Sequence, residues 1–252
     1  MAVAAPVQIG GYWVYLRDMI DGSGYGSSHL NPSTYQIQNA WQFRTELIHI
    51  GYCNTAIAGI IGNAQVESGL TPGAIQKPSV LPNGAERVED VPNSYMLRYY
   101  NPPSGGAGYG LGMLQWDRLS GTYNTNDLLG WTNANGYEWY EGIGQAARLD
   151  FEFNHDSTYH FWRMNWGSLT WADFRDIETA RPDYGPEDAA DIWASCWELS
   201  STSETGRRYR RENARYWYDL FSGAIGPGAI KVLMLNNMTK RKRGGTNVRI
   251  HV

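Results

Sequence analysis

One glutamate in this sequence stands where a carboxyl can act as a general acid. Glu67 ends an apolar segment, residues 55–67. In a helix, burial and the negative C-terminal end of the dipole both disfavour the charged carboxylate, so we expect a raised pKa for Glu67. A carboxyl that keeps its proton near neutral pH can protonate a glycosidic oxygen. The alternative is a glutamate that lies in water at a helix end, where charged residues are common.

The helix that would carry this carboxyl is marked at both ends. Asn54 or Thr55 can cap its start, and Gly69 stands where a helix ends. At about 100° per residue, Ile60 and Glu67 share one face. The carboxyl is therefore predicted to point in the same direction as the apolar stripe.

A glycine-rich loop, residues 105–112, follows later in the chain and leads to Gln115. No Lys-Ser or Lys-Thr pair follows the glycines, which argues against a phosphate cradle. Glycine lets a backbone approach a sugar closely, because it has no Cβ. A plain flexible loop is the alternative. Aromatic rings in or beside the loops that flank Glu67 can stack on sugar faces, and these are Tyr95, Tyr99, Tyr109 and Trp116.

These motifs resemble the phage tail lysozyme family of the lysozyme-like superfamily, which also includes goose-type lysozymes and lytic transglycosylases. The family pattern is an apolar helix ending in Glu-Ser-Gly, then Gly-Tyr-Gly-Ile-Gly-Gln-Trp, then a tryptophan-rich helical region. This chain has Glu67, Ser68 and Gly69 at the first element. It departs from the second, because Met113 and Leu114 stand between the last glycine and the glutamine.

The resemblance extends over residues 38–222. Residues 145–153 are similar to the family helix that packs under the active site, and residues 188–198 and 207–218 are similar to its closing pair of helices. It implies a mainly α, lysozyme-like (α+β) fold, in which a helical catalytic domain carries a loop-rich substrate cleft. Each motif is weak alone, but their order and spacing are fairly specific.

The resemblance also implies the reaction. Glu67 would be the general acid that cleaves the bond between N-acetylmuramic acid and N-acetylglucosamine. Gln115 would hold the sugar or the attacking group, and Ser68 would help to position Glu67 or the substrate. The residues expected to contact substrate are Ser68, Tyr95, Tyr99, Tyr109, Gly110, Gln115 and Trp116.

The sequence leaves parts of the mechanism open. Glycosidases commonly use two carboxyls, and none of the candidates in the loops stands out; these are Glu86, Glu89, Asp90 and Asp117. Hydrolysis and lytic transglycosylation use the same acid. A third alternative is a tail-tip structural or carbohydrate-binding protein that keeps this fold without turnover, because one fold hosts many functions.

Three segments are predicted. Residues 1–37 form an N-terminal extension with a strand at residues 12–16, residues 38–222 form the catalytic domain, and residues 223–252 form a linker and tail. A helix is predicted at residues 33–49. The glycines and proline of residues 223–228 mark the second boundary.

Composition agrees with an enzyme that acts on the cell wall. A net charge of −4 gives no reason to expect nucleic acid as a specific ligand. No apolar run reaches the roughly 18 residues of a membrane span, and the N-terminus lacks the features of a secretory signal. A phage tail would carry such a protein to the host wall, with peptidoglycan as its substrate and other tail proteins as partners.

Other ionisable residues are assigned ordinary roles. His155 and His160 are not spaced as zinc ligands, so no metal and no cofactor is expected. Cys53 and Cys196 could form one bridge, but they are predicted to be two buried free thiols on separate helices. Four arginines are predicted to form a solvated face with one or two pairs that point to the core, and they are Arg207, Arg208, Arg210 and Arg211.

Overall fold

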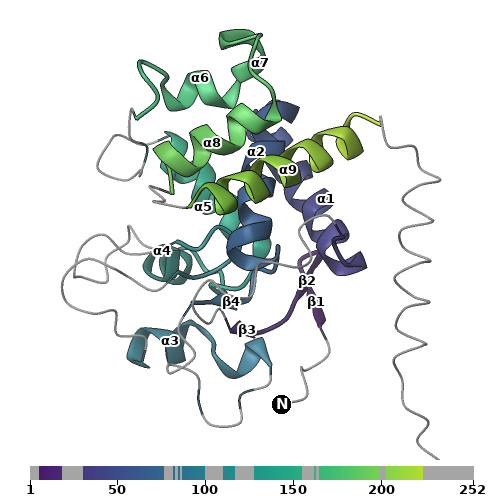
Figure 1. The fold of residues 1–252 in the computed structure, drawn as a ribbon. Coiled ribbons are helices and arrows are strands. Elements are labelled where there is room, and N and C mark those ends of the chain that lie inside the picture. Colours follow the sequence, from purple (N-terminus) through teal and green to yellow (C-terminus); the bar gives the residue numbers. More distant parts are fainter. Residues whose placement is uncertain are drawn as a thin grey trace, which may run out of the picture.

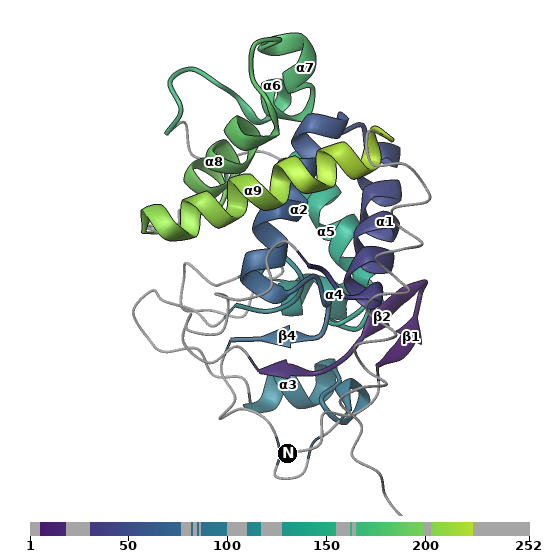
Figure 2. The same cartoon turned by 45° about the vertical axis from the view of Figure 1, so that its right-hand side comes forward.

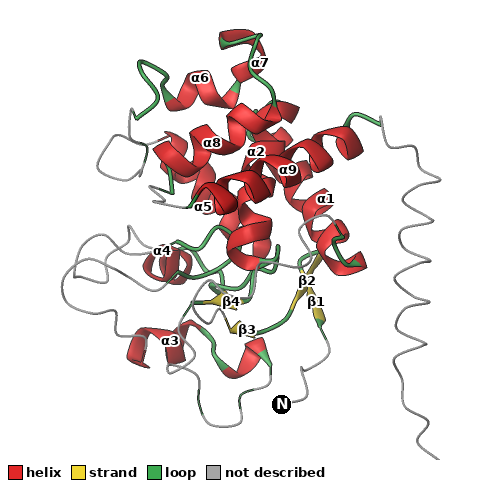
Figure 3. Cartoon of the chain, in the orientation of Figure 1, coloured by secondary structure: helices red, strands yellow, loops and turns green. Residues whose placement is uncertain are grey.

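Helices make up most of the chain that the structure describes, which confirms the predicted mainly α fold (Figure 1, Figure 3). The structure is a computed structural model, and it describes residues 6–18, 31–76, 82, 85, 87–99, 110–116, 128–154, 162, 165–198 and 203–223. The helices are α1 Thr34–His49, α2 Asn54–Ser68, α3 Asn93–Tyr99, α4 Leu128–Ala134, α5 Gly142–Asn154, α6 Trp171–Arg175, α7 Ile177–Ala180, α8 Pro186–Cys196 and α9 Glu204–Phe221, with a short 3₁₀ helix at Val88–Asp90. The strands are β1 Val7–Ile9, β2 Tyr12–Val14, β3 Arg17–Asp18 and β4 Ala74–Ile75.

The predicted helix at residues 33–49 is confirmed as α1. Ser33 caps it, because the Ser33 hydroxyl accepts a hydrogen bond from the Gln36 backbone N–H and the Gln36 side chain accepts one from the Ser33 N–H. Ile37, Phe43 and Leu47 are buried along one face. This local pattern explains why the helix was predictable from its own residues.

The central helix is α2, which α8 and α9 cross (Figure 1, Figure 2). It ends as predicted, with Gly69 in the left-handed conformation at φ 63°. Its predicted start is wrong in one respect, because neither Asn54 nor Thr55 caps it. Instead, Oε1 of Glu178 accepts hydrogen bonds from the N–H and the hydroxyl of Thr55, at 2.9 and 2.7 Å. A carboxylate from α7 thus satisfies one of the free N–H groups of the first turn.

Two glycines let the neighbouring helices approach α2 closely. A Cβ at Gly59 would lie 2.7 Å from the carbonyl carbon of Ala189 in α8. One at Gly62 would lie 2.8 Å from the backbone nitrogen of Ala214 in α9. Because these contacts are with backbone atoms, no side-chain rotation can relieve them. The small residues of α2 therefore fix where α8 and α9 cross it.

Replacing Gly62 by alanine is expected to lower the free energy of unfolding by about 1 to 3 kcal/mol, as over-packing does in other cores. At a solvent-exposed helix position the same change is stabilising by about 1 kcal/mol. The sign of the change in the free energy of unfolding therefore tests whether α9 packs this closely on Gly62. Urea unfolding followed by tryptophan fluorescence measures it. Unchanged or increased stability would show that α9 does not approach α2 this closely.

The N-terminal residues contribute a hairpin to the same core. β1 and β2 pair antiparallel, and Gly10 and Gly11 form the turn with φ of 55° and 85°. Tyr12 and Val14 are fully buried. The Asn39 side chain in α1 accepts a hydrogen bond from the Trp13 N–H and donates one to the Trp13 carbonyl. The part of the predicted N-terminal extension that the structure describes therefore packs on the helical domain.

A second small sheet lies below α2 and beside α3 in Figure 1. β3 and β4 pair in parallel, with Arg17 opposite Ala74 and Asp18 opposite Ile75. β4 begins five residues after Gly69, so it lies close to the end of α2 in the chain. This sheet is the support for the glycine-rich loop.

Several predictions fall outside the described residues. They concern the tail after residue 223, the histidines His155 and His160, and most of the loop between residues 77 and 109. Cys53 and Cys196 are free thiols, as predicted, and Cys196 is buried at the end of α8. Cys53 differs from the prediction, because it is half-buried and stands at the N-cap of α2 instead of within a helix. Within the described ranges, no helix has both the length and the apolar character that a membrane crossing requires.

Candidate active site

Glu67 occupies the last turn of an otherwise buried helix. Every other residue of α2 is buried except Asn54 at the opposite end. The Glu67 side chain is 28% exposed, so its carboxyl lies at the edge of the core with access to solvent. Leu70, which follows the helix, has a positive φ of 60°, and its N–H donates to the Ser68 hydroxyl. The turn after Glu67 is thus tightly held.

The carboxyl of Glu67 is paired with Arg210 of α9. Nη2 of Arg210 donates a hydrogen bond to Oε1 of Glu67, and the Arg210 side chain is only 2% exposed. The same nitrogen lies 3.6 Å from Oε2 of Glu198, which follows α8 and is 7% exposed. One guanidinium therefore serves two carboxyls that come from distant parts of the chain.

The protonation of the two carboxyls depends on burial and on each other. Burial raises the pKa of Glu67, although the charge of Arg210 and its hydrogen bond act to lower it. Burial and the charge of Glu67 raise the pKa of Glu198 to about 8, against the opposing effects of Arg210 and Trp193. The direction of the shift at Glu67 is the one that the sequence predicts for a general acid.

The described end of the glycine-rich loop, residues 110–112, is bound to the strand that follows α2. The Gly112 N–H donates to the Ala74 carbonyl, and the Gln76 N–H donates to the Gly110 carbonyl, at 2.8 and 2.9 Å. Gln76 Oε1 in turn accepts from the Gly110 N–H. These bonds place the loop beside the chain that leaves Glu67.

The glycines of this loop make room for glutamine side chains. A Cβ at Gly110 would lie 2.6 Å from Oε1 of Gln115, and one at Gly112, where φ is 77°, would lie 2.6 Å from Nε2 of Gln145. Gln145 is fully buried and binds the Met113 N–H and the carbonyls of Pro72 and Trp139. The sequence suggested a sugar as the group that approaches these glycines, whereas in the structure it is the protein itself.

Gln115 and Trp116 have different environments. Gln115 is partly exposed, has a φ of 53°, and donates from Nε2 to the Gly112 carbonyl. Trp116 is 3% exposed and donates its indole N–H to Oε1 of Glu152 at 2.7 Å. The expectation that Trp116 stacks on a sugar is therefore wrong, because its ring packs in the core.

Glu152 of α5 connects the loop to α8. Its Oε1 also lies 3.1 Å from Nη2 of Arg148, and its Oε2 accepts the indole N–H of Trp197 at 3.0 Å. Glu152 and Arg148 are both fully buried. Residues 145–153 thus lie under the loop, and the buried ion pair anchors it. Sequence reasoning did not identify this role for Glu152.

Of the other residues that were expected to contact substrate, one is buried beside Glu67 and two lie together on α3. Ser68 is fully buried, and its hydroxyl donates to the Ala64 carbonyl, so it shapes the turn after Glu67. Tyr95 and Tyr99 lie together on α3, with ring centroids 4.5 Å apart, and Tyr99 is 48% exposed. α3 lies near β3 and β4 in both views (Figure 1, Figure 2). Tyr109 is outside the described residues.

The structure describes two of the four carboxyls that the sequence offered as a second acidic group, Glu89 and Asp90, and both interact with Arg87. Glu89 is exposed and paired with Arg87, and the Asp90 carboxylate accepts from the Arg87 N–H. Glu86 and Asp117 are outside the described residues. Within the described part of the chain, Glu198 is the carboxyl that shares a cation with Glu67.

Of the four arginines that the sequence singled out, Arg208 is exposed, Arg207 and Arg211 are half-buried, and Arg210 is buried. Arg208 is 60% exposed, and Arg211 pairs with Asp191 and Glu204. A signal for the burial of Arg210 was present in the sequence. It occupies the same helical stripe as Ala214, Trp217 and Phe221, which are all buried. An arginine in an apolar stripe needs an acidic partner, and that partner is Glu67.

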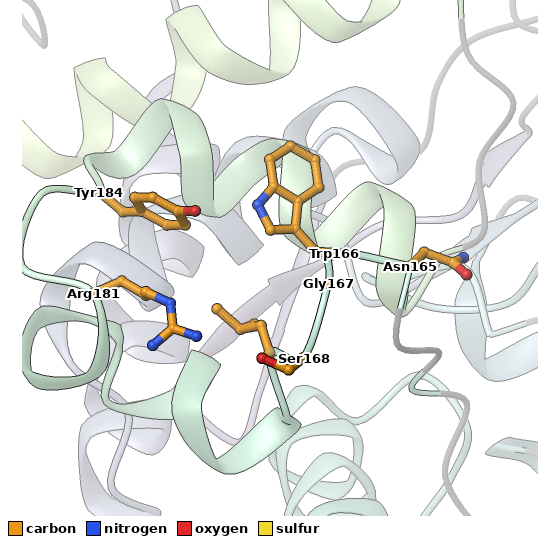
Figure 4. Close-up of a pocket in the computed structure, with 7 residues that line it drawn as sticks. Asn165, Trp166, Gly167, Ser168, Arg181 and Tyr184 are labelled. Atoms are coloured by element: carbon orange, nitrogen blue, oxygen red, sulfur yellow. The ribbon is translucent and has the colours of Figure 1, made fainter.

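An open pocket of about 480 Å³ lies elsewhere, among the segments that precede α6 and α8 (Figure 4). Trp166, Arg181 and Tyr184 border it, together with Asn165, Gly167, Ser168 and Leu169. None of the residues expected for the catalytic site lines it. It is therefore separate from the Glu67 site.

Comparison with known families agrees with this geometry. Residues 38–221 match the family model described as phage tail lysozyme. This range, which is most of the chain, includes Glu67, Glu198 and Arg210, the glycine-rich loop, α2 to α9, and α1 except for its first four residues. The chain therefore belongs to the phage tail lysozyme family, a family of peptidoglycan-lytic proteins.

Proposed function

We propose that this protein is a muramidase of a phage tail, which cleaves the bond between N-acetylmuramic acid and N-acetylglucosamine to open the cell wall locally for DNA entry. One observation carries the proposal. Glu67 is the partly exposed carboxyl in the last turn of a buried helix, the strand that follows this helix binds the described end of the glycine-rich loop, and burial raises the pKa of Glu67. Family membership supplies peptidoglycan as the substrate class.

In the proposed reaction, Glu67 gives its proton to the glycosidic oxygen as the bond to the anomeric carbon of the muramic acid breaks. Water then adds its hydroxyl to that carbon, and its remaining proton restores the Glu67 carboxyl. Gln115 is partly exposed on the loop and is proposed to hold the sugar or the attacking water. Tyr95 and Tyr99 are proposed to stack on sugar rings. The proposed partners are other tail proteins, which place the enzyme at the host wall.

The test is to digest purified peptidoglycan and to identify the products by mass spectrometry. Muropeptides that end in a reducing N-acetylmuramic acid are the expected products. Anhydro-muramic ends would show that the enzyme is a lytic transglycosylase using the same acid. If the protein binds peptidoglycan but releases no fragments, it is a structural or carbohydrate-binding protein and the proposed activity is wrong.

A further inference from the structure

The cation beside Glu67 is shared with a second carboxyl. Arg210 comes from α9, Glu67 from α2, and Glu198 from the residues just after α8 (Figure 1). Nη2 of Arg210 contacts Oε1 of Glu67 and lies 3.6 Å from Oε2 of Glu198. Both carboxylate oxygens of Glu198 are buried, and neither has a partner within normal hydrogen-bond geometry among the described residues. A small displacement of the guanidinium would exchange one partner for the other.

The formal charges of these three groups favour one retained proton. With both carboxyls ionised, the three side chains carry a net charge of −1 in a site where Arg210 is 2% and Glu198 is 7% exposed. Burying an uncompensated charge is strongly unfavourable. One proton shared between the carboxyls makes the group neutral, as in other pairs of close carboxyls.

Other charged groups on α8 and α9 pair with one another. On α8, Asp191 pairs with Arg211 of α9, which also pairs with the exposed Glu204, and the charge of Arg207 acts on Asp191 as well. The charged groups that act on Glu198 are Glu67 and Arg210. Within the described residues, the protonation of Glu67 is therefore tied to that of Glu198 through Arg210.

We propose that Glu198 is a positioning residue for Glu67, which takes over the pairing with Arg210 and thereby lets Glu67 hold the proton that it donates. This inference rests on the proposed role of Glu67 as the acid. In the free protein Arg210 contacts Glu67, which favours an ionised Glu67 and a protonated Glu198. A sugar that covers the exposed edge of Glu67 removes water from it and disfavours its charge. As the sugar settles, Glu67 takes up one proton and Glu198 releases one to solvent, so the two carboxyls still hold one proton in total. Arg210 then pairs with Glu198.

The pH dependence of cleavage distinguishes this role from a merely structural one. In Glu198→Gln, Arg210 has only Glu67 to pair with, so the ionised form of Glu67 is favoured. The alkaline limb of the kcat/KM profile on dye-labelled peptidoglycan is expected to move down by about one pH unit, which is about tenfold lower relative activity along that limb. Arg210→Gln removes the cation and is expected to move the limb in the opposite direction. Glu198→Asp keeps the carboxyl and should restore most of the wild-type profile.

Glu187→Gln is the matched control, because Glu187 also lies on α8 and pairs with an arginine of α9, but at the exposed surface. It should leave the limb where it is. A limb that stays in place, or rises, in Glu198→Gln overturns the proposal. Full activity in Glu67→Gln would instead overturn the proposed acid, so the two failures are distinguishable.

A measurement on the wild-type protein covers the case in which a variant does not fold. Carboxyl carbon shifts of ¹³C-labelled glutamate, followed by NMR against pH, report both groups directly. Coupled titration, in which the Glu67 and Glu198 signals each change over the same two steps, supports the shared proton. Independent single-step curves for the two residues contradict it.

Discussion

Replacing Glu67 by glutamine is expected to lower the rate of muropeptide release by about 10²- to 10⁴-fold, the usual contribution of a general acid. Glutamine has nearly the same size but no proton to give to the leaving oxygen. The fold should persist, because Arg210 keeps Glu198 as an acidic neighbour at 3.6 Å. The Glu67 side chain lies at the edge of the core and is 28% exposed, so replacing it by glutamine removes few packing contacts.

The measurement is the initial rate of fragment release from purified peptidoglycan, with circular dichroism to verify the fold. Glu89→Gln is the control, since Glu89 is an exposed carboxyl that pairs with Arg87 and was one candidate for a second acidic group. Its rate should equal that of the wild type. If Glu67→Gln releases fragments at the wild-type rate, Glu67 has no part in the reaction.

Replacing Glu152 by glutamine is expected to lower the free energy of unfolding by about 3 to 5 kcal/mol, as removal of one partner of a buried ion pair does. Glu152 accepts hydrogen bonds from the indoles of Trp116 and Trp197 and pairs with Arg148. A glutamine amide would leave Arg148 without its carboxylate and would set an NH₂ group against these donors. The loss is a large fraction of the roughly 5 to 15 kcal/mol that stabilises an ordinary domain.

Urea unfolding measures this loss, and Glu187→Gln is again a suitable comparison. Glu187 and Arg215 form an exposed pair through two hydrogen bonds of 2.7 Å, and such pairs contribute about 1 kcal/mol or less. The double variant Arg148→Met with Glu152→Leu should recover part of the stability, because it leaves no buried charge. Equal losses in Glu152→Gln and Glu187→Gln would mean that the Glu152 pair is not buried in solution.

The sequence by itself determined the helices that position the acid. The capping box of Ser33 and Gln36 and the C-cap glycine Gly69 depend on interactions within a few residues of each other. They can therefore be recognised from the sequence alone. The motif order also identified the family, and with it the mainly α architecture. The stripe that contains Arg210, Ala214 and Trp217 held the information that Arg210 is buried, although sequence reasoning assigned no single arginine to the core.

The tertiary structure decided which groups meet. Arg210 lies 143 residues from Glu67 in the chain, and Trp116 lies 36 residues from Glu152. Sequence motifs predicted that Trp116 stacks on a sugar and that the loop glycines face a sugar. In the folded chain the indole N–H of Trp116 donates to Glu152, and the side chain of Gln145 packs against Gly112. Capping and helical periodicity are local interactions that neighbouring residues specify. The partner of a buried charge is set by how distant helices pack, and only the folded chain contains that information.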